Sequence, residues 1–209
     1  GAGLCYIIGR KSAAARDYGV NAVTALEFLA MLYVFIAYFN AAGWIGRNPA
    51  GTENLTGYVT YGRIPEICGM GINFALNGFR AVYGLIAAFM WMLSTVFSKE
   101  YFAGYRNRNR YYLFLLVTLG ATMGVFLSAD LYTMFIFFEI MSFTSYVWVA
   151  HDEKADSLRA AETYLAVAVC GGLVMLMGIF LLYHMAGTLD VDGLLRVCSD
   201  IRNGSGAEY

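Results

Sequence analysis

Charged residues are scarce in this sequence, and their scarcity excludes an ordinary soluble domain. Lys, Arg, Asp and Glu make up 14% of the 209 residues, whereas soluble domains contain about 25%. Residues with hydrophobic side chains make up 59%. The composition therefore predicts a polytopic membrane protein in contact with the lipid bilayer. Because the net charge is only −1, no nucleic-acid partner is expected.

Motifs for bond chemistry, redox groups and metals are also missing. The cysteines show no metal-ligand spacing and stand far apart, at Cys5, Cys68, Cys170 and Cys198. The sequence has no Gly-rich phosphate loop, no nucleophile elbow and no pair of histidines within an apolar run. We therefore expect no cofactor, metal, disulfide or catalytic site on this chain. The sequence leaves open whether the chain belongs to an enzyme, whose redox centres would then lie on other chains.

Several apolar runs are long enough to cross a bilayer as helices, which takes about 20 residues at about 1.5 Å rise each. Spans are expected at residues 19–42, 79–97, 111–128, 130–150 and 160–186, after a helix stub at residues 1–8. Between the first two spans lies a Gly-rich extramembrane loop, residues 43–78, in which weak alternation at 56–63 and 71–78 predicts a β-hairpin. The expected fold is thus an all-α transmembrane helix bundle, in one domain, with a short extramembrane hairpin.

The two ends of the sequence indicate a fragment of a longer protein. The chain starts without Met and without the layout of a signal peptide, directly inside the apolar stub. It finishes in a polar outer tail, residues 187–209, that has no closing element.

Lys and Arg residues are divided unequally between the two sides of the predicted bundle. One side holds Arg10, Lys11, Arg16, Lys99, Arg106, Arg108, Arg110, Lys154 and Arg159. The other side holds Arg47, Arg63, Arg80, Arg196 and Arg202. Cytoplasmic loops carry an excess of basic residues, so the first side is expected to be cytoplasmic.

One carboxyl group lies near the middle of the fourth predicted span. Glu139 follows Asp130 by about 13 Å of helical rise. A charged carboxylate at that depth costs about 2.5–3.5 kcal/mol on insertion scales, so it is expected to serve a purpose. Its helical face also carries three hydroxyl groups, those of Tyr132, Ser142 and Tyr146.

A carboxyl group balanced between desolvation and a nearby cation can take up and release protons. Glu139 is therefore predicted to take part in proton translocation. The alternative is a permanently neutral Glu139 that holds helices together by hydrogen bonds, worth about 0.6–2 kcal/mol, in a membrane scaffold.

Other polar residues are weaker candidates. Glu27 lies in the first span, where it could also reach the cytoplasmic interface. Arg159 and Thr163 lie at the cytoplasmic mouth of the last span, within reach of the helix that carries Glu139. Asp130 is expected to cap a helix N-terminus, where free N–H groups stabilise a carboxylate.

Small residues recur at helical spacing on two spans. They are Gly120, Gly124 and Ser128 on one span, and Ala168 and Gly172 on the last. Such faces allow neighbouring helices to approach closely, so both are predicted to be packing faces.

The block at residues 119–147 resembles a known family. Its turn, Gly-Val-Phe-Leu-Ser-Ala-Asp-Leu, leads into a helix with Phe-Phe-Glu139, as in the antiporter-like proton-channel subunits. That family includes large membrane subunits of respiratory complex I, subunits of multisubunit cation/proton antiporters and subunits of membrane-bound hydrogenases. Residues 76–79 and 160–189 resemble further family motifs more loosely.

This resemblance implies that the chain is a partial copy of an inverted-repeat antiporter-like fold in a prokaryotic inner (plasma) membrane. It implies that Glu139 belongs to a proton path, with a Lys partner on the next helix. The expected partners are other membrane subunits of a multisubunit complex, and protons, with Na⁺ as an open alternative. Thr163 stands where many members have Lys, which leaves open whether this chain pumps in the usual way.

Overall fold

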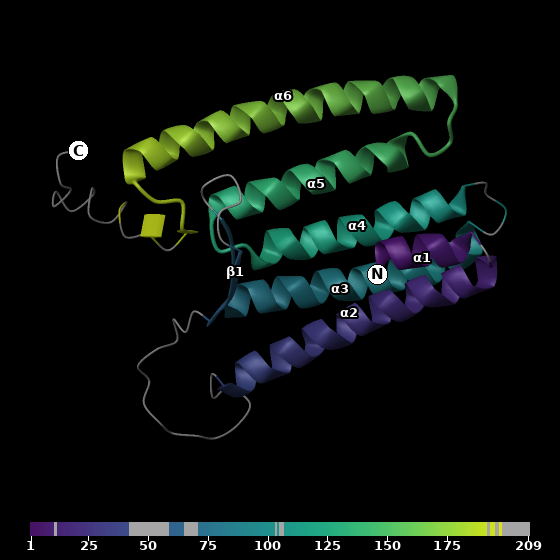
Figure 1. Cartoon of the computed structure of the whole chain (residues 1–209), viewed down its shortest axis with the longest axis horizontal. Helices are drawn as coiled ribbons and strands as arrows, with labels where there is room; N and C mark the ends of the chain where they lie inside the picture. The colour runs from purple at the N-terminus through teal and green to yellow at the C-terminus, as the bar shows by residue number, and fades with distance from the viewer. Residues whose placement is uncertain are drawn as a thin grey trace.

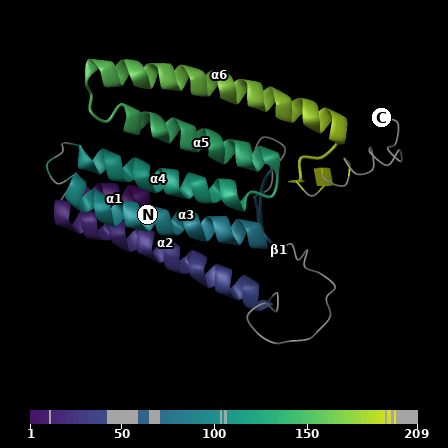
Figure 2. The same cartoon turned by 180° about the vertical axis from the view of Figure 1, so that it is seen from behind.

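Long antiparallel helices lie side by side in the computed structural model, which describes residues 1–10, 12–41, 59–64, 71–102, 104, 107–191, 193–194 and 197. The helices are α1 (Ala2–Gly9), α2 (Ala13–Ala41), α3 (Gly78–Tyr101), α4 (Arg108–Leu127), α5 (Leu131–Val149) and α6 (Ala155–Ala186). The strands are β1 (Val59–Ile64) and β2 (Ile72–Leu76). From α2 to α6 the helices follow one another across the molecule in chain order (Figures 1 and 2). The short α1 packs against α2 and α4.

Within the described ranges, five helices, α2 to α6, are long and apolar enough to cross a membrane. This confirms the predicted polytopic helix bundle. Two helices begin earlier than expected, α2 at Ala13 rather than residue 19 and α6 at Ala155 rather than residue 160. Each extension contains a charged residue that is stabilised where it lies. Asp17 of α2 is ion-paired, and Asp156 lies in the first turn of α6, where the helix dipole favours a negative charge.

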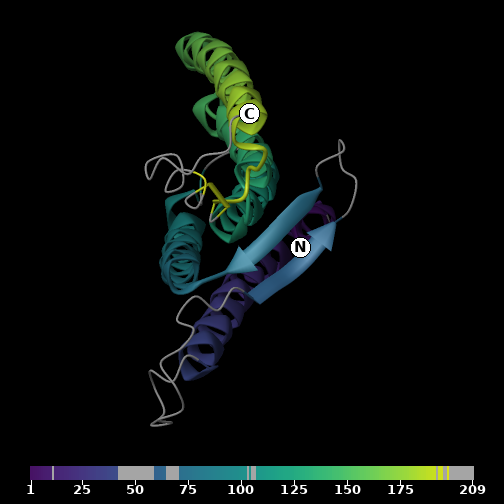
Figure 3. The same cartoon turned by 90° about the vertical axis from the view of Figure 1, so that its left-hand side faces the viewer.

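The predicted hairpin is present. β1 and β2 pair antiparallel, with Val59 opposite Leu76 and Ile64 opposite Ile72, and the register shifts between Thr60 and Gly62. The hairpin lies across the helix ends (Figure 3). Most of the expected loop 43–78 and most of the outer tail 187–209 lie outside the described residues.

We call the two ends of the bundle the basic end, where α2, α4 and α6 begin, and the hairpin end, where α3 and α5 begin. The described basic residues of the basic end are Arg10, Arg16, Lys99, Arg108, Arg110, Lys154 and Arg159. Only Arg63 and Arg80 represent the hairpin end among the described residues. Most of the described Lys and Arg residues thus lie at one end of the bundle, the end that the sequence predicts to be cytoplasmic.

Two apolar clusters hold the helices together. The larger joins α1, α2, α3 and α4 through buried residues that include Cys5, Val20, Ala88 and Leu119. The smaller joins α5 and the end of α6 through Tyr132, Ile179 and Leu189. Between helices in a bilayer such contacts stabilise by van der Waals packing rather than by removal from water, and these clusters show which helices pair.

Asp130 caps α5, as predicted, and also ties the hairpin to the bundle. Its Oδ1 accepts a hydrogen bond from the backbone N–H of Thr133 at 2.7 Å. Its Oδ2 accepts from Thr133 Oγ1 and from Asn73 Nδ2 of β2, both at 2.9 Å. The same carboxylate therefore satisfies the start of α5 and positions β2 against it.

The predicted small-residue face on α4 is only partly correct. A Cβ atom at Gly124 would lie within 2.6 Å of Phe137 Cε1 on α5, so glycine is required there. Gly120 is exposed, and a Cβ atom there would meet no atom of the described structure within 4 Å. A side chain at Gly120 would therefore have free space, although Gly120 shares a helix face with Gly124.

We expect Gly124→Ala and Gly120→Ala to have opposite effects on stability. Alanine at Gly124 forces Phe137 out of place and should destabilise the protein by about 1–3 kcal/mol. Alanine at Gly120 should be neutral or stabilising by up to about 1 kcal/mol, since it raises helix propensity. Thermal unfolding in detergent measures both, and equal melting temperatures for the two variants would contradict the packing described here.

Candidate functional site

Glu139 lies near the middle of α5, which packs between α4 and α6. Its side chain is half-buried. The surrounding helices are apolar over the lengths needed to cross a bilayer. Local sequence explains the placement along the helix, because Asp130 fixes where α5 begins and Glu139 follows about 13 Å further on.

The carboxyl group of Glu139 occupies the space beside Gly172 of α6. A Cβ atom at Gly172 would lie 2.8 Å from Cδ and 3.0 Å from Oε2 of Glu139, and closer still to Oε1. Gly172 itself is buried. The sequence predicts a packing face at Gly172, and the structure shows that what packs there is the carboxyl group.

Glu139 Oε1 is buried and has no hydrogen-bond partner among the described residues. A buried polar atom without a partner is costly, and a buried charge costs more than a neutral group. The site is therefore sensitive to the arrival of a proton, a cation or a water molecule. Such sensitivity is what distinguishes a group that exchanges protons from one that is fully satisfied by its neighbours.

The three hydroxyl residues of the Glu139 face have different surroundings. Tyr132 is buried in the apolar cluster with Ile179 and Leu189, about two turns toward the hairpin end. Ser142 and Tyr146 are half-buried and lie toward the basic end. Within the described part of the chain, neither hydroxyl is hydrogen-bonded to Glu139.

A polar contact that the sequence did not single out lies one turn from Glu139. The hydroxyl of Tyr164, on α6, donates to the backbone carbonyl of Ser142 at 3.3 Å. This bond joins α5 to α6 on the basic-end side of the carboxyl group. Tyrosine at an apolar helix interface usually finds a partner for its hydroxyl, which is the signal that could have pointed to it.

Arg159 and Thr163 do not approach Glu139. Both are exposed on α6, and Thr163 Oγ1 donates to the carbonyl of Arg159 at 3.0 Å, one turn back on its own helix. Thr163 also lies about 13 Å along α6 from Gly172. Their predicted support of Glu139 therefore stays a prediction, and it would have to act over that distance along α6.

Glu27 lies at the middle of α2 and is half-buried. Helices α3 and α4 stand between α2 and α5 (Figures 1 and 2), so Glu27 and Glu139 belong to helices that are not neighbours. The sequence predicts a position nearer the helix start, and the earlier start of α2 corrects it.

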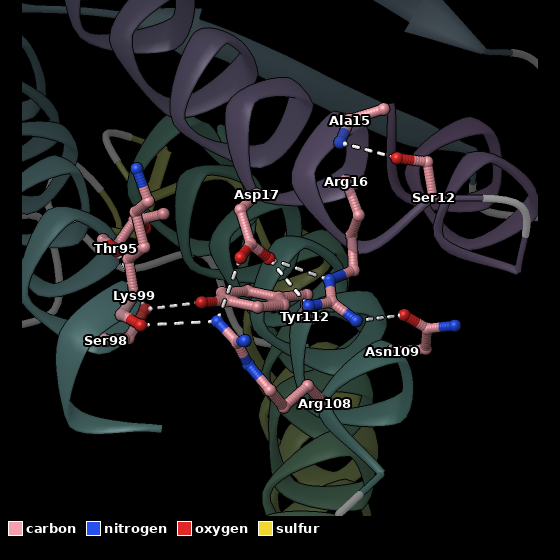
Figure 4. Close-up of polar contacts among 10 residues, drawn as sticks. All are labelled: Ser12, Ala15, Arg16, Asp17, Thr95, Ser98, Lys99, Arg108, Asn109 and Tyr112. Carbon is pink, nitrogen blue, oxygen red and sulfur yellow. Dashed lines mark hydrogen bonds and ion pairs between the residues drawn. The ribbon is translucent and has the colours of Figure 1, made fainter. Parts of the chain in front are cut away.

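The structure also brings together a charged cluster at the basic end that the sequence analysis missed. Asp17 accepts from Arg16 Nη2 at 2.7 Å through Oδ1 and from Arg108 Nη2 at 3.0 Å through Oδ2. The two guanidinium groups flank the carboxylate beside the ring of Tyr112 (Figure 4). Arg16 also donates to the side chain of Asn109. Arg16 and Asp17 are only 5% and 8% exposed, so this is a buried network.

The cluster is continued by contacts to α3. Arg108 Nη2 donates to the carbonyl of Lys99 at 3.3 Å, and Ser98 Oγ donates to the hydroxyl of Tyr112 at the same distance. The starts of α2 and α4 and the end of α3 are thereby held together. A charged pair next to an apolar run, Arg16 and Asp17, is the sequence signal that could have indicated it.

Comparison with known proteins agrees with this architecture. The model of the family described as NADH:quinone oxidoreductase/Mrp antiporter, TM, matches residues 128–207. One Na⁺/H⁺ antiporter subunit of Alkalihalophilus pseudofirmus is 32% identical over 147 residues, which is 68% of this chain and 18% of that protein. One Na⁺/H⁺ antiporter subunit of Staphylococcus epidermidis is 31% identical over 141 residues, 67% of this chain and 18% of that protein.

A solved structure shows the same fold. It is a chain of the membrane-bound sulfane sulfur reductase, an archaeal respiratory membrane complex. The TM-score is 0.78 at 19% identity, over 96% of this chain and 38% of that one. The present chain thus spans less than a fifth of the two curated relatives and well under half of this structural neighbour.

The helix bundle, with a carboxyl group near the middle of one helix, defines a class, the polytopic membrane proteins. Within that class, the chain belongs to the antiporter-like subunit family, which confirms the predicted resemblance.

Proposed function

We propose that this chain takes part in proton translocation, as an antiporter-like subunit of a multisubunit respiratory or cation/proton antiporter complex. Glu139 takes up a proton and passes it on when a neighbouring cation moves. The observation that carries the proposal is a buried carboxyl oxygen near the middle of a membrane helix, without a hydrogen-bond partner in the described structure. The expected Lys partner would belong to a later helix.

The packing around Glu139 supports this role. Gly172 leaves room for the carboxyl group, and the Tyr164–Ser142 bond fixes the adjacent part of the α5–α6 interface. A proton-carrying carboxyl group needs a fixed position and an oxygen that is free to accept a proton. The contact with Gly172 supports the first condition, and the lack of a partner for Oε1 among the described residues supports the second. Ser142 and Tyr146 lie on the basic-end side, where their hydroxyls can support a hydrated route toward the carboxyl group.

The other candidate is a scaffold in which Glu139 stays neutral and hydrogen-bonds between helices. That role requires a partner on an adjacent helix, since an interhelical hydrogen bond is what would stabilise the scaffold. The lack of a partner for Oε1 among the described residues weighs against it. A place in a prokaryotic plasma membrane, together with other membrane subunits, is a further part of the proposal, and Na⁺ transport stays an open alternative.

Infrared difference spectroscopy separates the two candidates. We expect a carboxyl C=O band in the difference spectrum recorded while the intact complex translocates protons, and we expect Glu139→Gln to remove it. Glu100→Gln is the control, because Glu100 is exposed at the end of α3. A difference spectrum without a Glu139 band would favour the scaffold and contradict the proposal.

A glycine pair on α6 tests the geometry of the site. Gly172→Ala should push the Glu139 carboxyl group away from α6 and reduce proton translocation about tenfold or more, because misplacement by about 1 Å is costly for a reacting group. Gly171→Ala is the matched control, since a Cβ atom there meets no described atom within 4 Å. Proton uptake by proteoliposomes measures both variants, and equal rates for the two would contradict this packing.

A further inference from the structure

A cavity of about 740 Å³ opens at the basic end of the bundle. It lies between the end of α1, the start of α2, the start of α4 and the turn that follows α5. Four of its lining side chains are arginines: Arg10, Arg16, Arg108 and Arg110. Arginine favours phosphate and carboxylate groups, because its planar fork of N–H groups can bind two oxygens at once.

The positive charge of this cavity is only partly neutralised. Arg16 and Arg108 share the carboxylate of Asp17, and Arg110 pairs with Glu153 at 2.7 Å. Arg10 has no ion pair with any described residue. Four guanidinium groups therefore face two carboxylates, which leaves a net charge of +2.

Hydrogen-bond donors are also left over around the cavity. The Nε atoms of Arg108 and Arg110 are buried and have no partner within the described part of the chain. The start of α4 adds further donors, since the side chain of Asn107, at φ 62°, makes no cap to the helix. Uncapped N–H groups at a helix start attract anions, and here they coincide with an arginine-lined cavity.

The location of the cavity indicates the source of the anion. It lies where four helix ends meet the edge of the membrane span, the level of lipid headgroups. Tyr6 lines the cavity and belongs to the apolar helix α1. The rim of the cavity is therefore polar on the arginine side and apolar on the α1 side. A ligand with a phosphate group and attached acyl chains matches both sides.

We propose that this cavity binds the phosphate group of an anionic membrane lipid. Arg10 and Arg110 meet the phosphate, while Arg16 and Arg108 are held in position by Asp17. The bound headgroup offsets part of the excess charge and joins α1 to α4. The site is separate from Glu139, so it does not depend on the proposed proton path.

Lipid binding to the intact protein tests this site. The protein is delipidated in detergent and titrated with phosphatidylglycerol or phosphatidylcholine, and bound lipid is counted by native mass spectrometry. We expect phosphatidylglycerol to bind in preference. Arg10→Gln and Arg110→Gln should each lower its affinity about fivefold, the effect of one basic residue near an anionic lipid. Lys154→Gln is the control, because it removes one charge from the same end at an exposed position.

A parallel titration with inorganic phosphate distinguishes the sources. If free phosphate does not displace phosphatidylglycerol, the lipid headgroup is the ligand, as proposed. Displacement by free phosphate would identify a soluble phosphate as the ligand and overturn the assignment to a lipid. Equal retention of phosphatidylglycerol by the unmodified protein, Arg10→Gln and Arg110→Gln would overturn the proposal.

Discussion

Glu139→Gln is expected to abolish proton translocation while the protein remains folded. The amide has nearly the same shape as the carboxyl group, so it fits the space beside Gly172 equally well. It cannot release a proton, and the loss of a proton-transferring group lowers rates by about 100-fold or more. The measurement is proton transport by the intact complex in proteoliposomes, followed with a pH-sensitive dye.

Two controls make this result interpretable. Glu100→Gln makes the same chemical change at an exposed site at the end of α3 and should leave transport unchanged. The melting temperature of Glu139→Gln should match that of the unmodified protein, since nothing in the described structure is hydrogen-bonded to Oε1. Undiminished transport by Glu139→Gln would end the proposal that this carboxyl group carries protons.

Among the proposed substitutions, Asp17→Asn is expected to lower the free energy of unfolding most. The substitution leaves the guanidinium groups of Arg16 and Arg108 without their shared counter-charge, at a site where Arg16 is only 5% exposed. Removing one partner from a buried ion pair costs about 3–5 kcal/mol, because the remaining charge is buried alone. Unfolding by denaturant in detergent micelles measures the change in the free energy of unfolding.

The matched control is Asp152→Asn. Asp152 pairs with Lys154 at 3.4 Å on the surface of the same end, so its loss should cost no more than about 1 kcal/mol. The double variant Asp17→Asn/Arg108→Gln should recover part of the lost stability, since one of the two uncompensated charges is then absent. Equal losses for Asp17→Asn and Asp152→Asn would show that the cluster does not stabilise the bundle.

Local sequence was sufficient for the features that depend on one helix at a time. Long apolar runs predicted the membrane helices, because a span needs only length and hydrophobicity. The cap at Asp130 could be predicted from its place before an apolar run, and the cap sets the position of Glu139 along α5. The family resemblance rested on the same block, and the comparisons confirm it.

The faces of the helices were harder to predict. A helix that is apolar all round gives no clear periodic signal for the side that turns inward. Gly120 and Gly124 look alike in sequence, yet only Gly124 contacts another helix. The sequence likewise did not show which way Arg159 and Thr163 point, and both are exposed on α6.

By itself, the sequence determined that this is a membrane helix bundle of the antiporter-like family with a carboxyl group near the middle of one helix. Only the tertiary structure decided that Glu139 lies against Gly172, and that Asp17 meets Arg108 from 91 residues away. The physical reason is that such contacts depend on the rotation and crossing of packed helices. Those are set by side chains from several helices together, and no single stretch of the chain contains them.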